Sequence, residues 1–184
     1  MGDHCDQFVD LETPLAAAGD RADDVRGWLS RAGWSTRTPV DSVLFPTAGW
    51  VEAGPGLHEL APGLRWAAIG VVAAAGIQKV CWYLGDSTGP ADCPRCGAAG
   101  SEDYWDAVSV WCGLEEPEPV LTCTACGAVA RVGDWDLRGA VAVGSLAVVV
   151  DLDRADDQDR AVTAVLRGLR AGLGGRWAHV HHHL

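Results

Sequence analysis

The sequence predicts an α+β fold in which a ferredoxin-like split βαβ sheet carries an inserted zinc-ribbon module. A unit of strand, amphipathic helix, glycine and tryptophan, then strand occurs twice, with Gly33-Trp34 in the first copy and Gly175-Arg176-Trp177 in the second. Two CxxCG motifs lie between the two copies. We therefore expect a discontinuous core domain of residues 1–89 and 138–184, and an inserted module of residues 90–137.

The first copy of the unit begins with a short apolar segment and a clear helix. Residues His4 to Leu11 end in Phe8, Val9 and Leu11, which favours a strand. Residues Asp20 to Gly33 place apolar side chains at helical spacing, with Asp20 or Asp23 as the expected N-cap and Gly33 as the end of the helix. The apolar stripe of this helix should face a core.

The segments that follow are less regular. Residues Trp34 to Phe45, closed by Pro46, suit a strand, and a loop rich in glycine and proline is expected from Thr47 to Gly63. Residues Leu64 to Leu84 predict one or two strands, but the sequence does not determine their register. The turn Gly85 to Pro90 then leads to the cysteine motifs.

The second copy of the unit is the more strongly patterned. Residues Gly144 to Leu152 form a continuous, valine-rich apolar run of strand length, which is typical of a strand buried on both faces. Residues Asp156 to Ala171 carry apolar residues at helical spacing, with acids near the start and arginines near the end, as the helix dipole favours. Residues Arg176 to Leu184 are the expected closing strand.

The two CxxCG motifs predict one structural zinc site. Cys93 and Cys96 belong to the first motif, and Cys123 and Cys126 belong to the second. Each CxxC turn brings two thiolates to one metal, and the following glycine lets the backbone fold back toward the sulfurs. Four thiolates fill a tetrahedral zinc, so no position is left for a reacting water. Two separate redox pairs are the alternative.

The spacer between the motifs is long for a minimal ribbon. Tyr104, Ala107, Val108 and Trp111 would share one helical face, which predicts a short helix within residues 102–111. Residues Val120 to Leu137 read as strand, cysteine turn and strand. The tryptophans around these segments are expected to pack the module, whereas Trp50 and Trp66 either pack or anchor a partner.

The composition narrows the classes of partner. The net charge is −11, with 14 basic residues scattered among 25 acidic ones, so nucleic-acid binding is disfavoured and a protein partner with a basic face is favoured. The longest apolar stretch, from Trp66 to Ile77, is shorter than a membrane span of about 20 residues. No cationic segment followed by an apolar run opens the chain, so we expect a cytoplasmic protein with reduced cysteines.

Histidines near residue 180 offer a second place for a metal. On a strand, His179, His181 and His183 would share one face, a geometry that suits a transition metal, although a solvated edge strand is the simpler explanation. Cys5 beside His4 is a further possible ligand, with a frayed terminus as the alternative. Cys81 and Cys112 are expected to be small buried hydrophobic residues.

No catalytic set is visible in the sequence. Asp151 and Asp153 follow an apolar strand, as in haloacid-dehalogenase-type phosphatases, but too little chain follows to supply the other catalytic residues. The acids from Asp153 onward are better explained as helix-capping charges. His58 has no identifiable catalytic partner, and no serine triad, Walker loop or dinucleotide motif is present.

The run from Cys93 to Val150 resembles a group of small, uncharacterised actinobacterial proteins. The resemblance rests on the paired CxxCG motifs, the intervening tryptophan-containing helix, the sequence Gly133-Asp134-Trp135 and the apolar strand after it. It implies the fold and the zinc site, but it carries no activity.

These observations favour a non-enzymatic interaction protein, such as an adaptor, an immunity protein or a regulatory protein. Two alternatives stay open. One is a metal-handling protein that uses the histidine cluster, and the other is an enzyme whose site lies between the sheet and the module. The sequence does not indicate an oligomeric state.

Overall fold

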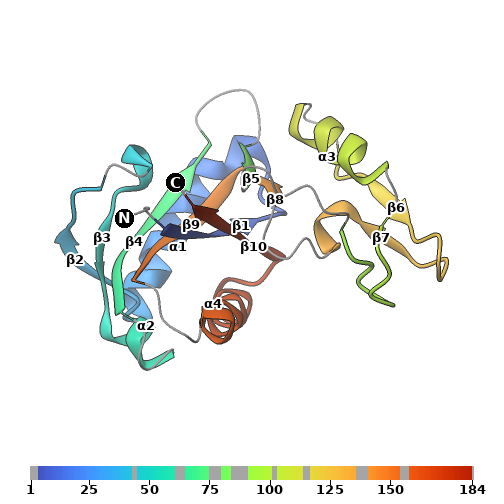
Figure 1. Cartoon of the computed structure of the whole chain (residues 1–184). Coiled ribbons are helices and arrows are strands. Elements are labelled where there is room, and N and C mark those ends of the chain that lie inside the picture. Colours follow the sequence, from blue (N-terminus) through green and yellow to red (C-terminus); the bar gives the residue numbers. More distant parts are fainter. Residues whose placement is uncertain are drawn as a thin grey trace.

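The computed structural model of the chain describes residues 4–42, 45–60, 65–74, 80–83, 91–100, 103–113, 117–135, 141–153 and 158–183. Among these residues it is a mixed α/β structure built around a six-stranded sheet (Figure 1). None of the described helices is long and apolar enough to cross a membrane.

The main sheet has the strand order β10-β1-β9-β4-β3-β2. Every neighbouring pair is antiparallel. The strand β1 lies between β9 and β10 and therefore runs opposite to both. The strands are β1 (His4–Asp10), β2 (Ser35–Pro39), β3 (Val51–Ala53), β4 (Arg65–Ala73), β9 (Leu146–Asp153) and β10 (Trp177–His183). The fold is therefore α+β, as the sequence predicts.

One face of the sheet is covered by helices α1 (Ala18–Arg31), α2 (Pro55–Leu60) and α4 (Gln158–Leu173). The predicted apolar stripes are confirmed, because Val25 and Leu29 of α1 and Val165 and Leu169 of α4 are buried in one cluster with Phe8 of β1. Burying such side chains contributes roughly 1.5–3 kcal/mol each, which makes this cluster a main source of stability.

The start of α1 differs from the prediction, whereas its end agrees. A 3-10 turn, η1 (Leu15–Ala17), leads directly into the helix, so the cap is Ala17 and no side chain caps it. Asp20 and Asp23 lie inside the helix and do not cap it. Gly33 adopts a φ of 70° just beyond the helix, a conformation that favours glycine.

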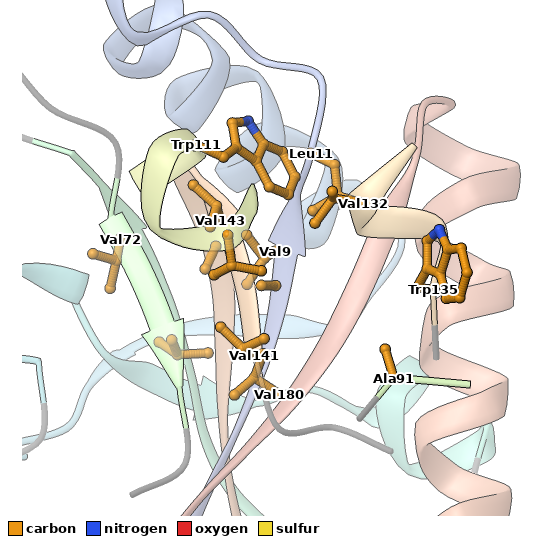
Figure 2. Close-up of a cluster of buried hydrophobic side chains, with 14 of the residues drawn as sticks. Val9, Leu11, Val72, Ala91, Trp111, Val132, Trp135, Val141, Val143 and Val180 are labelled. Atoms are coloured by element: carbon orange, nitrogen blue, oxygen red, sulfur yellow. The ribbon is translucent and has the colours of Figure 1, made fainter. Parts of the chain in front are cut away.

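The opposite face of the sheet packs against residues on either side of the cysteine motifs and within them. Strands β5 (Val80–Tyr83) and β8 (Val141–Gly144) pair with each other, and β8 contributes buried valines above β1 and β9. The strand β8 was not predicted. Figure 2 shows Trp111 and Val132 of the cysteine region near Leu11, which directly follows β1, with Val9 of β1 and Val143 of β8 close to Trp111.

The cysteine region forms its own small set of elements. It contains helix α3 (Asp103–Gly113), strands β6 (Val120–Thr122) and β7 (Val129–Arg131), and the 3-10 turn η3 (Val132–Asp134). The helix and the two-stranded hairpin are both as predicted, and Figure 1 shows them projecting beyond one side of the sheet. The predicted limits at residues 90 and 137 fall outside the described residues and stay a prediction.

Several expectations for residues 34–63 are wrong. The strand after α1 is only β2, and the predicted loop contains the turn η2 (Pro46–Ala48), the strand β3 and the helix α2. The strand β2 lies at the edge of the sheet, and β3 and β4 separate it from β9. The narrower prediction, a ferredoxin-like split βαβ sheet, is therefore not confirmed.

The structure answers two questions that the sequence left open, the register of residues 65–73 and the role of Trp50. Pairing of β4 with β9 supplies the register that the sequence left open for residues 65–73, with one irregularity between Trp66 and Ala68. Trp50 is 5% exposed, so it packs inside the protein and does not anchor a partner. The side chain of Trp66 lies outside the described ones.

An arginine joins the main sheet to the cysteine region. Arg176, just before β10, donates two hydrogen bonds to the Glu118 carboxylate, at 2.5 and 2.9 Å, and two more to Oδ1 of Asp134, at 2.9 and 2.7 Å. Oε1 of Glu118 also accepts a hydrogen bond from the Gly133 N–H at 2.7 Å. The side chains of Arg176 and Glu118 are 21% and 10% exposed, so water screens this pair only partly.

We predict that Arg176→Ala destabilises the protein by about 2–3 kcal/mol, because it leaves the Glu118 carboxylate without its charged partner. Arg176→Lys should recover only part of this loss, since an ammonium cannot reproduce the bidentate geometry. The free energy of unfolding in urea measures both effects. Arg167→Ala, at an exposed position on α4, is the matched control and should change stability by less than about 0.5 kcal/mol. Equal losses at the two arginines would contradict the assignment.

Candidate metal centre and cavity

The four predicted cysteines converge at one point. The Sγ atoms of Cys93, Cys96, Cys123 and Cys126 all lie within 4.8 Å of one another. Across the two motifs, Cys93 lies 3.9 Å from Cys126, and Cys96 lies 3.8 Å from Cys123. A disulfide would need about 2.05 Å, whereas sulfurs at the corners of a tetrahedron, each about 2.3 Å from a metal, lie about 3.8 Å apart. The group can therefore hold one metal ion.

The two cysteine turns have the same local structure. In the first, Cys93 N–H donates to the Ala98 carbonyl at 2.8 Å, and Gly97 N–H donates to the Cys93 carbonyl at 2.9 Å. The second turn repeats both bonds with the same lengths, from Cys123 to Ala128 and from Gly127 to Cys123. Two equivalent turns thus present two sulfurs each from opposite sides.

The backbone favours a thiolate at Cys93. The Arg95 N–H donates to Cys93 Sγ at 3.4 Å. This hydrogen bond, together with one from the Cys96 backbone, lowers the pKa of Cys93 to about 7. At Cys93 these amide groups therefore favour the thiolate, which is the form that binds a metal.

Both turns depend on a left-handed glycine. The φ angles of Gly97 and Gly127 are 69° and 70°, a region that other residues adopt at a cost. A Cβ atom at either position would meet nothing within 4 Å. The requirement for glycine is therefore conformational and has no steric component from neighbouring residues.

We predict that Gly97→Ala and Gly127→Ala each destabilise the metal-loaded protein by about 1–2 kcal/mol through backbone strain alone. Gly19→Ala is the matched control, because Gly19 lies exposed in the first turn of α1 and also has open space around its Cβ position. That variant should be neutral or slightly stabilising. Urea unfolding monitors all three, and unchanged stability in both turn variants would show that the left-handed conformation is not required.

The histidine cluster is brought together with an acid that the sequence did not single out. Asp6 of β1 pairs directly across the sheet with His181 of β10, and His179 lies two residues along the same face. Asp6 Oδ1 lies 2.5 Å from His179 Nε2 and 3.1 Å from His181 Nδ1. These three donor atoms also lie within 4.8 Å of one another. The side chain of His183, the third predicted member, lies outside the described ones.

Asp6 is fully buried while carrying a charge. Burial raises the pKa of this carboxyl group, but the hydrogen bonds with His179 and His181 outweigh burial and leave the pKa below its ordinary value. Asp10, the other acid of β1, is explained by structure alone. Its carboxylate accepts hydrogen bonds from the backbone of Glu12 and Thr13, so it fixes the turn after the strand.

The signal for Asp6 was present in the sequence. A strand buried at the centre of a sheet rarely carries an acid without a partner, and Asp6 alternates with Phe8 on the face covered by the helices. The partner itself was not identifiable, since the histidines lie more than 170 positions further along the chain.

The remaining cysteines do not join either group. Cys5 is fully buried within β1, which contradicts the expectation of a frayed terminus, and its Sγ is not brought into the histidine group. Burial raises the pKa of the Cys5 thiol. Cys112 is half-buried and disulfide-bonded, so it is not the small buried hydrophobic residue that the sequence predicts. The side chain of Cys81 lies outside the described ones.

A cavity of about 920 Å³ lies between the core and the cysteine region. Its wall is mostly apolar, with a few polar groups from α4 and β10. Representative lining residues are Thr163 and Leu166 of α4, His179 and His181 of β10, and Trp111 and Trp135 near the cysteine motifs. Trp135 Nε1 is buried and has no hydrogen-bond partner among the described residues. This volume is in the range of small-molecule sites.

In comparisons with known proteins, no family model, no curated protein and no solved structure matches the chain. The resemblance to actinobacterial proteins therefore gains no support beyond the cysteine cluster itself. The four converging sulfurs and the α+β fold are the features that the structure shows.

Proposed function

We propose that the cysteine group binds one zinc ion and that this zinc is structural. The support comes from the donor set, because four thiolates suit zinc and leave no coordination position for a substrate or water. Cys93 and Cys123 are also part of the buried cluster shared with the sheet, so the metal stabilises packing as well as the turns. In this proposal the module spans residues 90–137.

Elemental analysis of purified protein should find that Cys93→Ser and Cys123→Ser each lose one equivalent of zinc relative to the wild type. Far-UV circular dichroism should show partial loss of structure in both variants, because metal binding and folding of the module are coupled. Cys5→Ala, a buried cysteine outside the group, is the control and should keep the zinc. Retention of the same zinc content in the Cys93 and Cys123 variants would refute the proposal.

We further propose that the protein is a non-enzymatic interaction protein that binds a partner through the hairpin β6–β7. The observation that carries this proposal is the pair Val120 and Val129, which are 57% and 66% exposed. Their cross-strand partners are Arg131 and Thr122, so both valines lie on one outward face of the hairpin. Leu121 and Ala130, on the other face, pack against the core cluster.

The hairpin is suited to binding because its conformation is already fixed. The β-strands lead directly into and out of the second cysteine turn, and the Arg176–Glu118 contact holds the segment just before β6. A surface that is ordered before binding loses less conformational entropy on association. Exposed apolar side chains on such a surface are typical of interaction sites.

Charge indicates the kind of partner. Residues 90–137 contain nine acidic residues and two arginines, a net charge of −7, and four thiolates with one zinc add a further −2. Most of the chain's charge of −11 is therefore concentrated in the module. A partner with apolar side chains rimmed by lysine and arginine fits this surface, since opposite charges steer association. The proposed role of a protein with such a surface is that of an adaptor, an immunity protein or a regulatory protein.

A photo-crosslinking amino acid placed at position 129 should capture one protein species in cells that express the chain natively. The matched control carries the same group at Thr38, an exposed position on the edge strand β2. Val129→Asp should abolish co-purification of the captured protein while leaving the zinc content unchanged. Capture of the same species from position 38, or co-purification that survives Val129→Asp, would contradict the proposal.

A second candidate is an enzyme or small-molecule-binding protein that uses the cavity between the sheet and the module. The buried Trp135 Nε1 favours it, because a ligand in the cavity would supply the missing hydrogen-bond acceptor. The two candidates differ in the expected effect of Val129→Asp, because the hairpin face does not line the cavity and ligand binding there should survive this substitution.

The cytoplasmic location stays a prediction, and a disulfide at Cys112 is unusual for a reducing compartment.

A further inference from the structure

The cluster of Asp6, His179 and His181 has the composition and placement of a metal site separate from the four cysteines. Two imidazoles and one carboxylate converge from adjacent strands, and all three side chains lie on the face of the sheet that α4 covers. From these features we infer that the protein binds a second, divalent transition-metal ion at Asp6, His179 and His181. This inference does not depend on the proposed partner.

The register of the sheet fixes the geometry. In an antiparallel pair, directly opposite residues have Cβ atoms about 4.5–5.5 Å apart on the same face, which places Asp6 against His181. Phe8 and Trp177 are buried on that face against the helices, and a slip of one residue would move both away from this packing to the opposite face. The apolar core therefore holds the ligands in place.

The atoms that converge are those a cation would use. Ligand atoms about 2.1 Å from a metal lie about 3.0 Å apart at neighbouring octahedral positions and about 3.4 Å apart at tetrahedral ones. Asp6 Oδ1 lies 3.1 Å from His181 Nδ1, which is within this range, and 2.5 Å from His179 Nε2, so metal binding requires the His179 ring to move away from Asp6. Phe8 packs against the His179 ring, with centroids 5.4 Å apart, and so limits its orientation.

The three donors converge on a single atom. Two ring nitrogens, from His179 and His181, approach the same oxygen atom of Asp6. A single divalent ion at this point would use all three donors.

The donor set indicates the class of metal and the state of the site. Imidazole nitrogens with one carboxylate suit iron, nickel, copper or zinc, and a set of two histidines and one carboxylate leaves further coordination positions open. His179 and His181 line the 920 Å³ cavity, so the open positions face that space. Unlike the closed cysteine site, this site can bind an exchangeable ligand with an oxygen or nitrogen donor.

The test is to titrate the full-length protein, prepared with one equivalent of zinc per chain for the cysteine site, with Ni²⁺ and to count bound nickel by elemental analysis after gel filtration. The wild type should bind one nickel per chain, whereas Asp6→Asn and His181→Ala should weaken this binding by at least the 10–100-fold that loss of an outer-shell partner costs. His58→Ala, at an exposed histidine on α2, is the matched control and should bind nickel as the wild type does.

Adjacent histidines could bind nickel at the surface, so the double variant His182→Ala/His183→Ala is required. It should retain the nickel site. Loss of nickel in this double variant together with unchanged binding in Asp6→Asn would overturn the inference, as would a wild type that binds none.

Thermal unfolding gives a second measurement in which each variant is compared with its own nickel-free state. Nickel should raise the melting temperature of the wild type but not that of His181→Ala, because a ligand that binds only the folded state stabilises it. His181 is partly exposed on the edge strand, so its removal tests the site even if Asp6→Asn fails to fold. A nickel-induced shift equal to that of the wild type in His181→Ala would also overturn the inference.

Discussion

The main sheet has two apolar faces, and the helices cover only one of them. In β9, Leu146, Val148 and Val150 point toward α1 and α4, whereas Ala147 and Val149 point to the other side. Fully burying that second side requires β8 and the residues of the cysteine region, which join it in one continuous cluster. The inserted segment is therefore part of the core packing and is not a separate appendage.

This arrangement explains why a metal suits the insertion. The buried apolar residues of the segment between β5 and β8, such as Tyr104, Trp111 and Val132, are directed into the cluster shared with the sheet. The side of this segment that faces away from the sheet therefore has little apolar core of its own. In the proposed zinc-bound state, four metal–sulfur bonds would provide the stability that additional packing would otherwise provide, while the Arg176 contact sets the position of the region against β10.

The features that the sequence predicted correctly are those encoded locally. The spacing of Cys93, Cys96, Cys123 and Cys126 identifies the sulfur cluster because each turn needs only five residues, and the apolar run before Asp151 identifies β9 because a strand buried on both faces has no polar alternation. Helical periodicity likewise identified α1, α3 and α4, apart from the N-cap of α1.

The features that were missed depend on residues far apart in the chain. The partner of Asp6 lies in the distant strand β10, and the partner of Glu118 is the distant Arg176, so neither contact is visible in the local sequence. Strand order is equally non-local, because nothing in residues 34–60 shows that β3 and β4 separate β2 from β9.

The position of β1 has a consequence for the way the chain folds. Both neighbours of this central strand lie late in the sequence, since Asp10 pairs with Leu146 and Trp177. At a synthesis rate of about 5–20 residues per second, roughly 7–30 s pass between the appearance of β1 and that of β9. During that interval Phe8 and Val9 have no sheet to join, whereas the cysteine turns, which are close in sequence, can already close around an ion. If the cysteines bind zinc as proposed, the metal site closes before the large sheet exists, whereas Tyr104, Trp111 and Val132 become fully buried only when the sheet forms.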